Sequence, residues 1–159
     1  MRSPRISWVL LAYRVPREPS TPRSALWRKL RRLGAAQVVD GLAALPLDAR
    51  NREQLEWLAD EVAEADGEAT VWVGELGSAA QERELAARMA EIVAADYRRL
   101  LEQAAAAREQ PPGQRRRTLA RLRRELRRIR ARDYFPPPER ELAHQALEEL
   151  VAVVEEPVG

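Results

Sequence analysis

The arrangement of apolar residues over positions 6–76 is the feature that most limits how this chain can fold. Residues 6–14, ISWVLLAYR, are almost continuously apolar, which is typical of a strand buried on both faces. Prolines follow the run, and Ser20 or Thr21 can cap a helix whose first position suits Pro22. Leucines at helical spacing continue to about Leu33, and Gly34 is a natural stop. The segment therefore predicts a strand followed by a helix.

A hairpin and a second helix–strand pair come next. Asp40-Gly41 separates two short apolar runs, which is a strong signal for a two-residue hairpin turn. After Pro46, either Asp48 or Asn51 can cap a helix that extends to about residue 66, where Gly67 closes it. Residues 68–76, EATVWVGEL, are again rich in strand-forming residues.

The predicted order is thus strand, helix, strand, strand, helix, strand, which is the ferredoxin-like βαββαβ arrangement. It predicts a four-stranded antiparallel sheet with two helices on one face, and with the first and last strands adjacent and central. The other face would then be covered by the rest of the chain or by a second copy. We interpret the four tryptophans as core residues, with base stacking as the alternative for any that is exposed; they are Trp8, Trp27, Trp57 and Trp72.

The pattern becomes helical after residue 77. We expect a long helix over residues 78–109, a second over 114–133 and a third from about residue 139, separated by the proline-containing breaks 110–113 and 133–138. The fold class is therefore α+β: a ferredoxin-like α/β sandwich in residues 1–77, followed by a three-helix C-terminal extension in residues 78–159.

Charge is strongly segregated along a chain whose net charge is only +2. Residues 1–35 carry +8, residues 36–113 carry −9, residues 114–133 carry +8 and residues 134–159 carry −5. Residues 114–133 alone contain ten arginines and two acids, and their apolar residues recur at helical spacing (Leu119, Leu122, Leu126 and Ile129). The segment therefore predicts an amphipathic helix with an arginine-covered outer surface. Charge segregation of this kind is evidence about binding partners and not about the fold.

The composition argues against several kinds of chemistry. The chain has no cysteine and one histidine, His144, so disulfides, thiolate chemistry and a histidine-rich metal site are excluded within it. It also has no glycine-rich phosphate loop and no assembled catalytic triad. We therefore expect no enzyme activity, no cofactor and no metal. The apolar N-terminal run is too short for an export signal or a membrane span, so we expect a cytoplasmic location and no membrane contact.

Arginine suits contact with a nucleic-acid backbone, because its guanidinium forms paired hydrogen bonds to phosphate and each contact releases counterions. The predicted contacts lie on the basic segment 114–133 and on the first helix, and comprise Arg115, Arg116, Arg117, Arg121, Arg124, Arg128, Arg28, Lys29 and Arg32. The alternative is that the arginines of 114–133 face acidic residues of the neighbouring helices, among them Glu82, Glu84, Glu91, Glu102, Glu148 and Glu149.

Several segments resemble the N-terminal domain of ChrB-type chromate resistance regulators. They are WVLLAYRVPREPSTPRSALWRKLRRLGA, the hairpin that ends in LP, EQLEWLADEVAEADGEA and RIRARDYFPPPERE, in that order and over nearly the whole chain. The resemblance implies a ferredoxin-like core with a helical extension and a role in bacterial transcriptional control of chromate resistance through DNA binding. The core is also similar to the middle domain of PaaX-type repressors and to the CRISPR-adaptation nucleases. The nucleases place a catalytic aspartate where this chain has Tyr13 and Arg14.

The leading hypothesis is a non-enzymatic regulatory module that binds DNA as a homodimer. The resemblance also implies a second, C-terminal domain, which we do not expect within these 159 residues, and a partner protein that carries this domain is a further expectation. We do not extend to this chain any chromate sensing that depends on the second domain. A structural or protein-interaction module without nucleic-acid binding is the alternative. The third hypothesis is a relative of the CRISPR-adaptation nucleases that lacks the catalytic aspartate.

Overall fold

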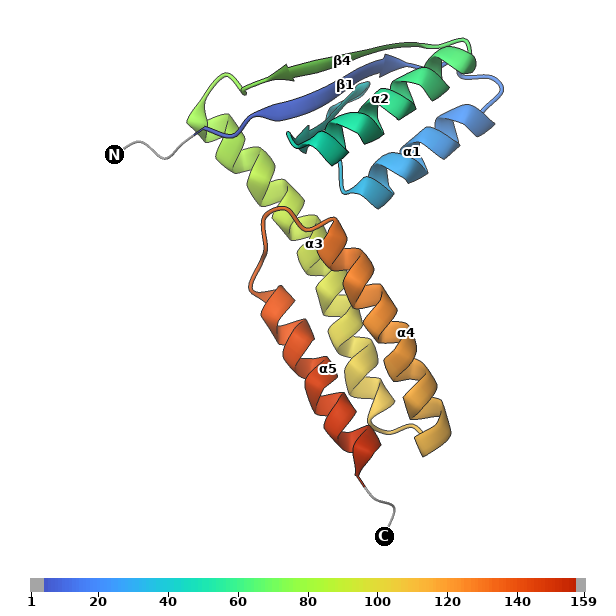
Figure 1. The fold of residues 1–159 in the computed structure, drawn as a ribbon, viewed down its shortest axis with the longest axis vertical. Helices are drawn as coiled ribbons and strands as arrows, with labels where there is room; N and C mark the ends of the chain where they lie inside the picture. The colour runs from blue at the N-terminus through green and yellow to red at the C-terminus, as the bar shows by residue number, and fades with distance from the viewer. Residues whose placement is uncertain (1–4, 157–159) are drawn as a thin grey trace. The chain divides into compact units, whose positions relative to one another are not determined.

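The computed structural model describes residues 5–156, which divide into two compact units, 5–89 and 90–156. Four strands and five α-helices make up the described chain (Figure 1), so the α+β class is confirmed. In chain order they are β1 (Trp8–Arg14), α1 (Thr21–Leu33), β2 (Ala36–Val39), β3 (Leu42–Pro46), α2 (Ala49–Glu64), β4 (Glu68–Gly74), α3 (Ala79–Ala107), α4 (Pro112–Ala131) and α5 (Glu139–Glu155). The boundary between the two units lies within α3. The domain boundary expected at residue 77 separates the strand-containing part from the all-helical part, and it stays a prediction.

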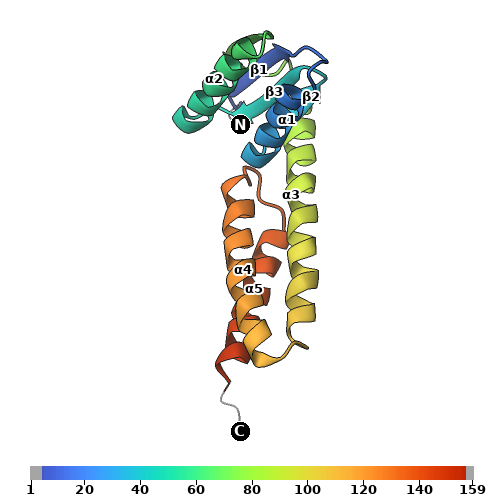
Figure 2. The same cartoon turned by 90° about the vertical axis from the view of Figure 1, so that its right-hand side faces the viewer.

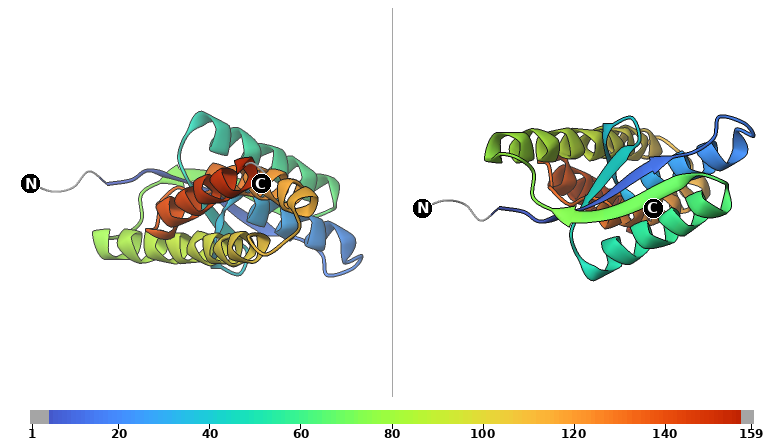
Figure 3. Two further views of the ribbon diagram at one scale, coloured as in Figure 1. Left: turned by 90° about the horizontal axis from the view of Figure 1, so that it is seen from below. Right: turned by 90° about the horizontal axis from the view of Figure 1, so that it is seen from above.

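The first unit contains one four-stranded sheet in the order β2-β3-β1-β4, in which every neighbouring pair is antiparallel. β1 lies between β3 and β4, so that Leu10 pairs with Ala44 on one side and with Trp72 on the other. The predicted adjacency of the first and last strands is confirmed. The prediction that both are central is wrong, because β4 forms an edge of the sheet (Figures 1 and 3).

Local signals in the sequence set the ends of these elements. The hairpin between β2 and β3 turns at Gly41, whose φ of 82° favours glycine, and a Cβ there would lie 2.8 Å from the carbonyl oxygen of Tyr13. Asp48 caps α2 by accepting a hydrogen bond of 2.6 Å from the backbone N–H of Asn51. Gly34 ends α1 in the left-handed conformation. These three predictions are confirmed.

Helices α1 and α2 lie on the same side of the sheet (Figures 1 and 2). The core of this unit is formed by side chains with no solvent exposure, including Val9, Leu11, Leu45 and Leu55. Two hydrogen bonds join the start of α3 to the segment before β1 and to β2. Glu82 accepts from the backbone N–H of Ile6 at 2.7 Å, and Arg88 donates to the carbonyl of Gln37 at 2.7 Å.

The tryptophans differ from the prediction, because only Trp8 is buried. The side chains of Trp27 and Trp57 are 54% exposed, and that of Trp72 is 60% exposed. Trp72 pairs with Leu10, so side-chain alternation places it on the sheet face opposite the buried Val9 and Leu11, whereas the other two lie on helix surfaces that face away from the core. The interpretation of all four as core residues is therefore wrong for three of them.

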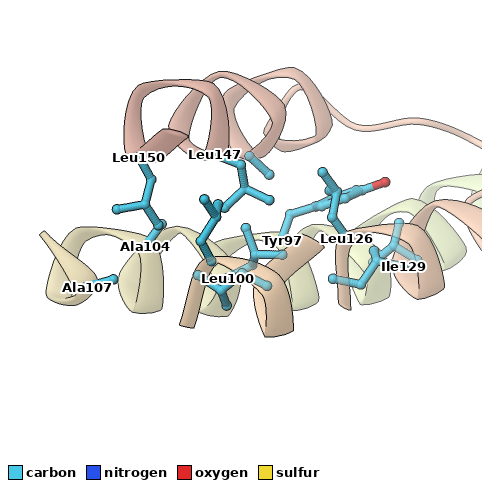
Figure 4. Packing of buried hydrophobic residues seen from close by; sticks show 12 residues of the cluster. Tyr97, Leu100, Ala104, Ala107, Leu126, Ile129, Leu147 and Leu150 are labelled. Atoms are coloured by element: carbon cyan, nitrogen blue, oxygen red, sulfur yellow. The ribbon is translucent and has the colours of Figure 1, made fainter. Parts of the chain in front are cut away.

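The second unit is a bundle of three helices: the later part of α3, then α4 and α5 (Figure 2). Its core is a cluster to which all three helices contribute, with Tyr97, Leu100, Ile129 and Leu150 among the buried side chains (Figure 4). The Tyr97 hydroxyl donates a buried hydrogen bond of 2.7 Å to Asp133, just beyond the end of α4. This bond connects α3 to the end of α4.

Candidate nucleic-acid interface

Helix α4 buries the apolar stripe that its sequence predicts and exposes most of its arginines. Leu119, Leu122, Leu126 and Ile129 are buried against the other two helices of the bundle. With that stripe turned inward, helical geometry distributes the arginines over the remaining surface. The exposed ones are Arg116, Arg117, Arg121, Arg123, Arg124, Arg127, Arg128 and Arg130.

Half of these arginines recur at helical spacing along one face of α4. They are Arg117, Arg121, Arg124 and Arg128, all of which the sequence predicted as contacts. Arg121 donates to the side-chain oxygen of Gln103 on α3 at 2.9 Å. Arg128 lies 3.6 Å from the carboxylate of Glu125 on its own helix. Arg121 and Arg128 thus have polar neighbours, but all four side chains remain exposed.

The other half form what we call the unpaired stripe: Arg116, Arg123, Arg127 and Arg130. Their successive separations of seven, four and three residues place all four side chains on one helix face. All four are exposed, and within residues 5–156 none has an ion-pair partner. Sequence reasoning selected Arg116 but left Arg123, Arg127 and Arg130 out of its predicted contacts. Their spacing was the signal that could have found them.

Arg115 is placed differently from the other predicted contacts. Its guanidinium donates to the carbonyl oxygens of Gln110 at 2.9 Å and Arg108 at 3.2 Å, so it is held against the turn that follows α3. Arg132 is also engaged, because it bonds to Asp96 of α3 at 2.9 Å. These two arginines hold α4 against α3 and are not part of the exposed surface.

The acidic residues of the bundle mostly have other partners. Glu91 pairs with Arg98 at 2.6 Å, Glu148 contacts His144 at 3.2 Å and Glu149 lies 3.9 Å from Arg108. Among the described residues, the only carboxylate within 4 Å of an arginine in positions 115–128 is Glu125, on the same helix. Pairing with neighbouring helices therefore does not neutralise the exposed arginines of α4.

The basic residues of α1 have closer neighbours. Arg28 and Arg32 are exposed, but Lys29 forms an ion pair of 2.6 Å with Glu61 of α2. The guanidinium of Arg31 lies over the ring of Trp27, 4.8 Å from its centroid. Only part of this cluster thus remains open to an anionic partner.

Comparison with known proteins identifies the family. The family described as "Protein ChrB, N-terminal" matches residues 23–110, which is more than half of the chain. The chain belongs to this family. A member, Protein ChrB of Cupriavidus metallidurans, is 35% identical over 82 residues, which cover 52% of this chain and 25% of that protein. The chain thus matches about a quarter of the length of this ChrB relative. No solved structure matches it.

The ChrB match begins in α1 and ends at Gln110, before α4 begins. It therefore includes the basic residues and Trp27 of α1, whereas the arginines of α4 lie beyond it. The family assignment and the argument from the α4 surface are for this reason independent of each other.

Other candidate sites have simple structural explanations. At the end of β1, Tyr13 donates to Gln37 at 3.1 Å and Arg14 pairs with Glu68 at 2.6 Å. Residues 5–156 contain no group of three His, Cys, Asp or Glu side chains that could hold a metal ion. None of the described helices combines the length and apolar character needed to cross a bilayer.

Proposed function

We propose that this chain is a non-enzymatic module of a bacterial transcription regulator related to chromate resistance, and that α4 binds DNA through its arginine side chains. The observation that carries the proposal is the set of exposed α4 arginines with a single carboxylate neighbour among the described residues. A cationic helix face without internal counterions attracts phosphates and releases the ions condensed on DNA. The exposed Arg28 and Arg32 of α1 are secondary contacts, with Lys29 shared between DNA and Glu61.

The family assignment supports the regulatory part of this proposal. The resemblance to ChrB-type regulators connects the module to transcriptional control, and a partner protein that carries the second, C-terminal domain is part of the same proposal. The strand order β2-β3-β1-β4, with two helices between strands, supports placing the first unit in the ferredoxin-like class.

The test is a titration of the full chain with duplex DNA at several salt concentrations, followed by fluorescence anisotropy. Each phosphate that the protein neutralises makes the slope of log K against log salt concentration more negative by about 0.9. Four contacts therefore predict a slope of about −3.6, which is roughly a 100-fold loss of affinity between 50 and 200 mM salt. Binding that is absent at low salt, or that salt does not weaken, would contradict the proposal.

A matched pair of variants separates the α4 surface from general charge. The double variant Arg123→Gln, Arg127→Gln removes two charges from the unpaired stripe, and the slope should become less negative by about 1.8. The control Arg50→Gln, Arg83→Gln removes two exposed charges from the first unit, and it should leave the slope unchanged. Equal effects of the two variants would show that net charge, not the α4 face, governs binding.

We further propose that the chain forms a homodimer through the free edge of β4. An open edge strand is a template for pairing with another strand, and natural edges are usually protected by lysine or proline. Glu68 is the single charged residue of β4, and Trp72 and Val73 are 60% and 48% exposed. Antiparallel pairing centred on Val71 would place the two Glu68 side chains at opposite ends, whereas parallel pairing in register would place them side by side.

Light scattering after gel filtration tests the dimer. Trp72→Lys places a charge on the proposed interface, so this variant should be a monomer where the unmodified chain is a dimer. Trp57→Lys is the control, because Trp57 is similarly exposed but lies on α2. A monomeric unmodified chain, or a dimer unaffected by Trp72→Lys, would refute the β4 interface.

A further inference from the structure

An open hollow lies beside the first turns of α1, in the first unit. Its volume is about 610 Å³, which falls within the range of about 300–1,000 Å³ typical of small-molecule sites. Six residues line it: Arg17, Ser20, Arg23, Ser24, Trp27 and Arg28. Three of these carry guanidinium groups, two carry hydroxyls and one is an aromatic ring. Neither the sequence nor the family assignment gave this hollow a role.

The charge of the hollow is positive and uncompensated. No carboxylate is among its lining residues, and the first turn of α1 carries no acidic side chain. Within the described chain, Arg17, Arg23 and Arg28 have no ion-pair partner. Guanidinium groups form paired hydrogen bonds with the oxygens of phosphate, and three of them around one space suit a dianion better than a carboxylate.

The two serines add hydrogen-bond donors of the right kind. Ser20 stands at the N-cap position of α1, but its hydroxyl makes no capping hydrogen bond. The Ser20 hydroxyl is thus available to an occupant, and that of Ser24 lines the same hollow one turn later in α1. Hydroxyls donate readily to phosphate oxygens.

Trp27 gives the hollow an aromatic wall. Its side chain is 54% exposed, and the guanidinium of Arg31 lies over the ring. Arg31 does not line the hollow, so it does not occupy the space in which a ring could stack on Trp27. Stacking on an aromatic side chain is favourable for any base, because every base has a π-face.

We infer that this hollow binds a single nucleotide, with its phosphate on Arg17, Arg23 and Arg28 and its base stacked on Trp27. Bases inside a duplex are already stacked on each other, so the occupant is a free nucleotide or the unpaired end of a strand. The inference does not depend on duplex binding by α4, because every residue of the hollow belongs to the first unit.

Quenching of tryptophan fluorescence by deoxyadenosine monophosphate tests the inference on the full chain. A stacked base should quench Trp27, so Trp27→Phe should lose the saturable quenching, and Trp57→Phe should retain it. The double variant Arg23→Gln, Arg28→Gln should bind the nucleotide at least tenfold more weakly. The charge-matched double variant Arg50→Gln, Arg83→Gln should bind it as tightly as the unmodified chain does. Inorganic phosphate should compete with the nucleotide, and deoxyadenosine without phosphate should bind at least tenfold more weakly.

A 5′-phosphorylated trinucleotide distinguishes the two sources of the ligand. Tighter binding of the trinucleotide would identify a strand end, and equal binding would identify a free nucleotide; both outcomes support the site. The proposed site would be overturned if quenching persisted in Trp27→Phe, or if Arg23→Gln, Arg28→Gln left the affinity for the nucleotide unchanged. The absence of saturable quenching in the unmodified chain would also overturn it.

The same titrations separate this site from the α4 surface. Arg123→Gln, Arg127→Gln should weaken duplex binding and leave nucleotide quenching unchanged. If nucleotide quenching is absent while duplex binding persists, the hollow is refuted and the proposed function stands. If duplex binding is absent while the nucleotide still quenches Trp27, the proposed function fails and the hollow stands.

Discussion

Helices α4 and α1 are both rich in basic residues, yet their surroundings differ. The unpaired stripe of α4 has neither carboxylates nor aromatic rings bonded to it among the described residues. On α1, Glu61 pairs with Lys29 and the ring of Trp27 holds Arg31. The same kind of side chain thus forms an open cationic face in one unit and a more structured surface with a hollow in the other. What surrounds the cations, rather than their number, distinguishes a backbone-binding face from a ligand site.

The two helices are also held in place differently. The end of α4 is attached to its bundle by one buried and one part-buried polar contact: Tyr97 bonds to Asp133 at 2.7 Å, and Arg132 bonds to Asp96 at 2.9 Å. The ion pair between α1 and α2 joins side chains that are 41% and 46% exposed. Buried polar contacts leave an unpaired group when one partner is removed, whereas exposed pairs are replaced by water. The following predictions test this contrast, from the largest expected effect to the smallest.

Removing the unpaired stripe should have the largest effect. The variant Arg116→Gln, Arg123→Gln, Arg127→Gln, Arg130→Gln should lower duplex affinity at low salt by roughly 100-fold or more, because about four phosphate contacts are lost. Anisotropy titrations measure the affinity. The thermal stability of this variant should stay close to that of the unmodified chain, since these side chains are exposed and unpaired. If this variant binds DNA as tightly as the unmodified chain, the unpaired stripe is not the DNA-binding face and the contrast between the two helices fails.

Removing the buried carboxylate at the end of α4 should destabilise the second unit. Asp133→Ala leaves the Tyr97 hydroxyl without its acceptor and Arg140 without a carboxylate 3.8 Å away. We expect a loss of about 1–3 kcal/mol in the free energy of unfolding, measured by urea denaturation. Tyr97→Phe removes the hydroxyl but leaves the ring, and its loss should be smaller. An unchanged stability for Asp133→Ala would show that the bundle does not need this contact.

Alkaline pH should weaken the second unit through Tyr97. Burial, the hydrogen bond to Asp133 and the charge of Asp133 raise the pKa of Tyr97, while Arg140 and Arg130 oppose the rise. The folded state therefore holds this proton more strongly than the unfolded state, so the stabilisation is complete below about pH 10 and declines as pH rises further. Denaturation between pH 9 and 11 should show a shallower decline for Tyr97→Phe. Parallel curves would contradict the assignment.

The exposed pair on α1 should contribute least to stability. Glu61→Gln removes the carboxylate that Lys29 contacts at 2.6 Å, and the expected loss is about 0–1 kcal/mol because water replaces the contact. The same variant frees Lys29 for an anion, so duplex affinity should rise slightly. Urea denaturation and anisotropy measure the two effects. A loss as large as that of Asp133→Ala would show that α1 depends on this pair as α4 depends on Asp133.

The sequence by itself determined the elements, because their signals are local. The Asp40-Gly41 turn, the Asp48 cap, the Gly34 stop and the apolar stripe of α4 each depend on a few neighbouring residues, and all appear where predicted. The arginine content of 114–133 was equally plain. These features required no knowledge of which segments meet in space.

Only the tertiary structure decided what those elements present to solvent. The pairing of Trp72 with Leu10 places it on the sheet face opposite the buried Val9 and Leu11 and leaves it exposed, although its apolar sequence alone would place it in the core. The meeting of α3 and α4 commits Arg115 to backbone carbonyls and Arg132 to Asp96, and it leaves the unpaired stripe open. The physical reason is that local patterns specify which face of an element is apolar, whereas the exposure and pairing of a side chain depend on segments distant in sequence.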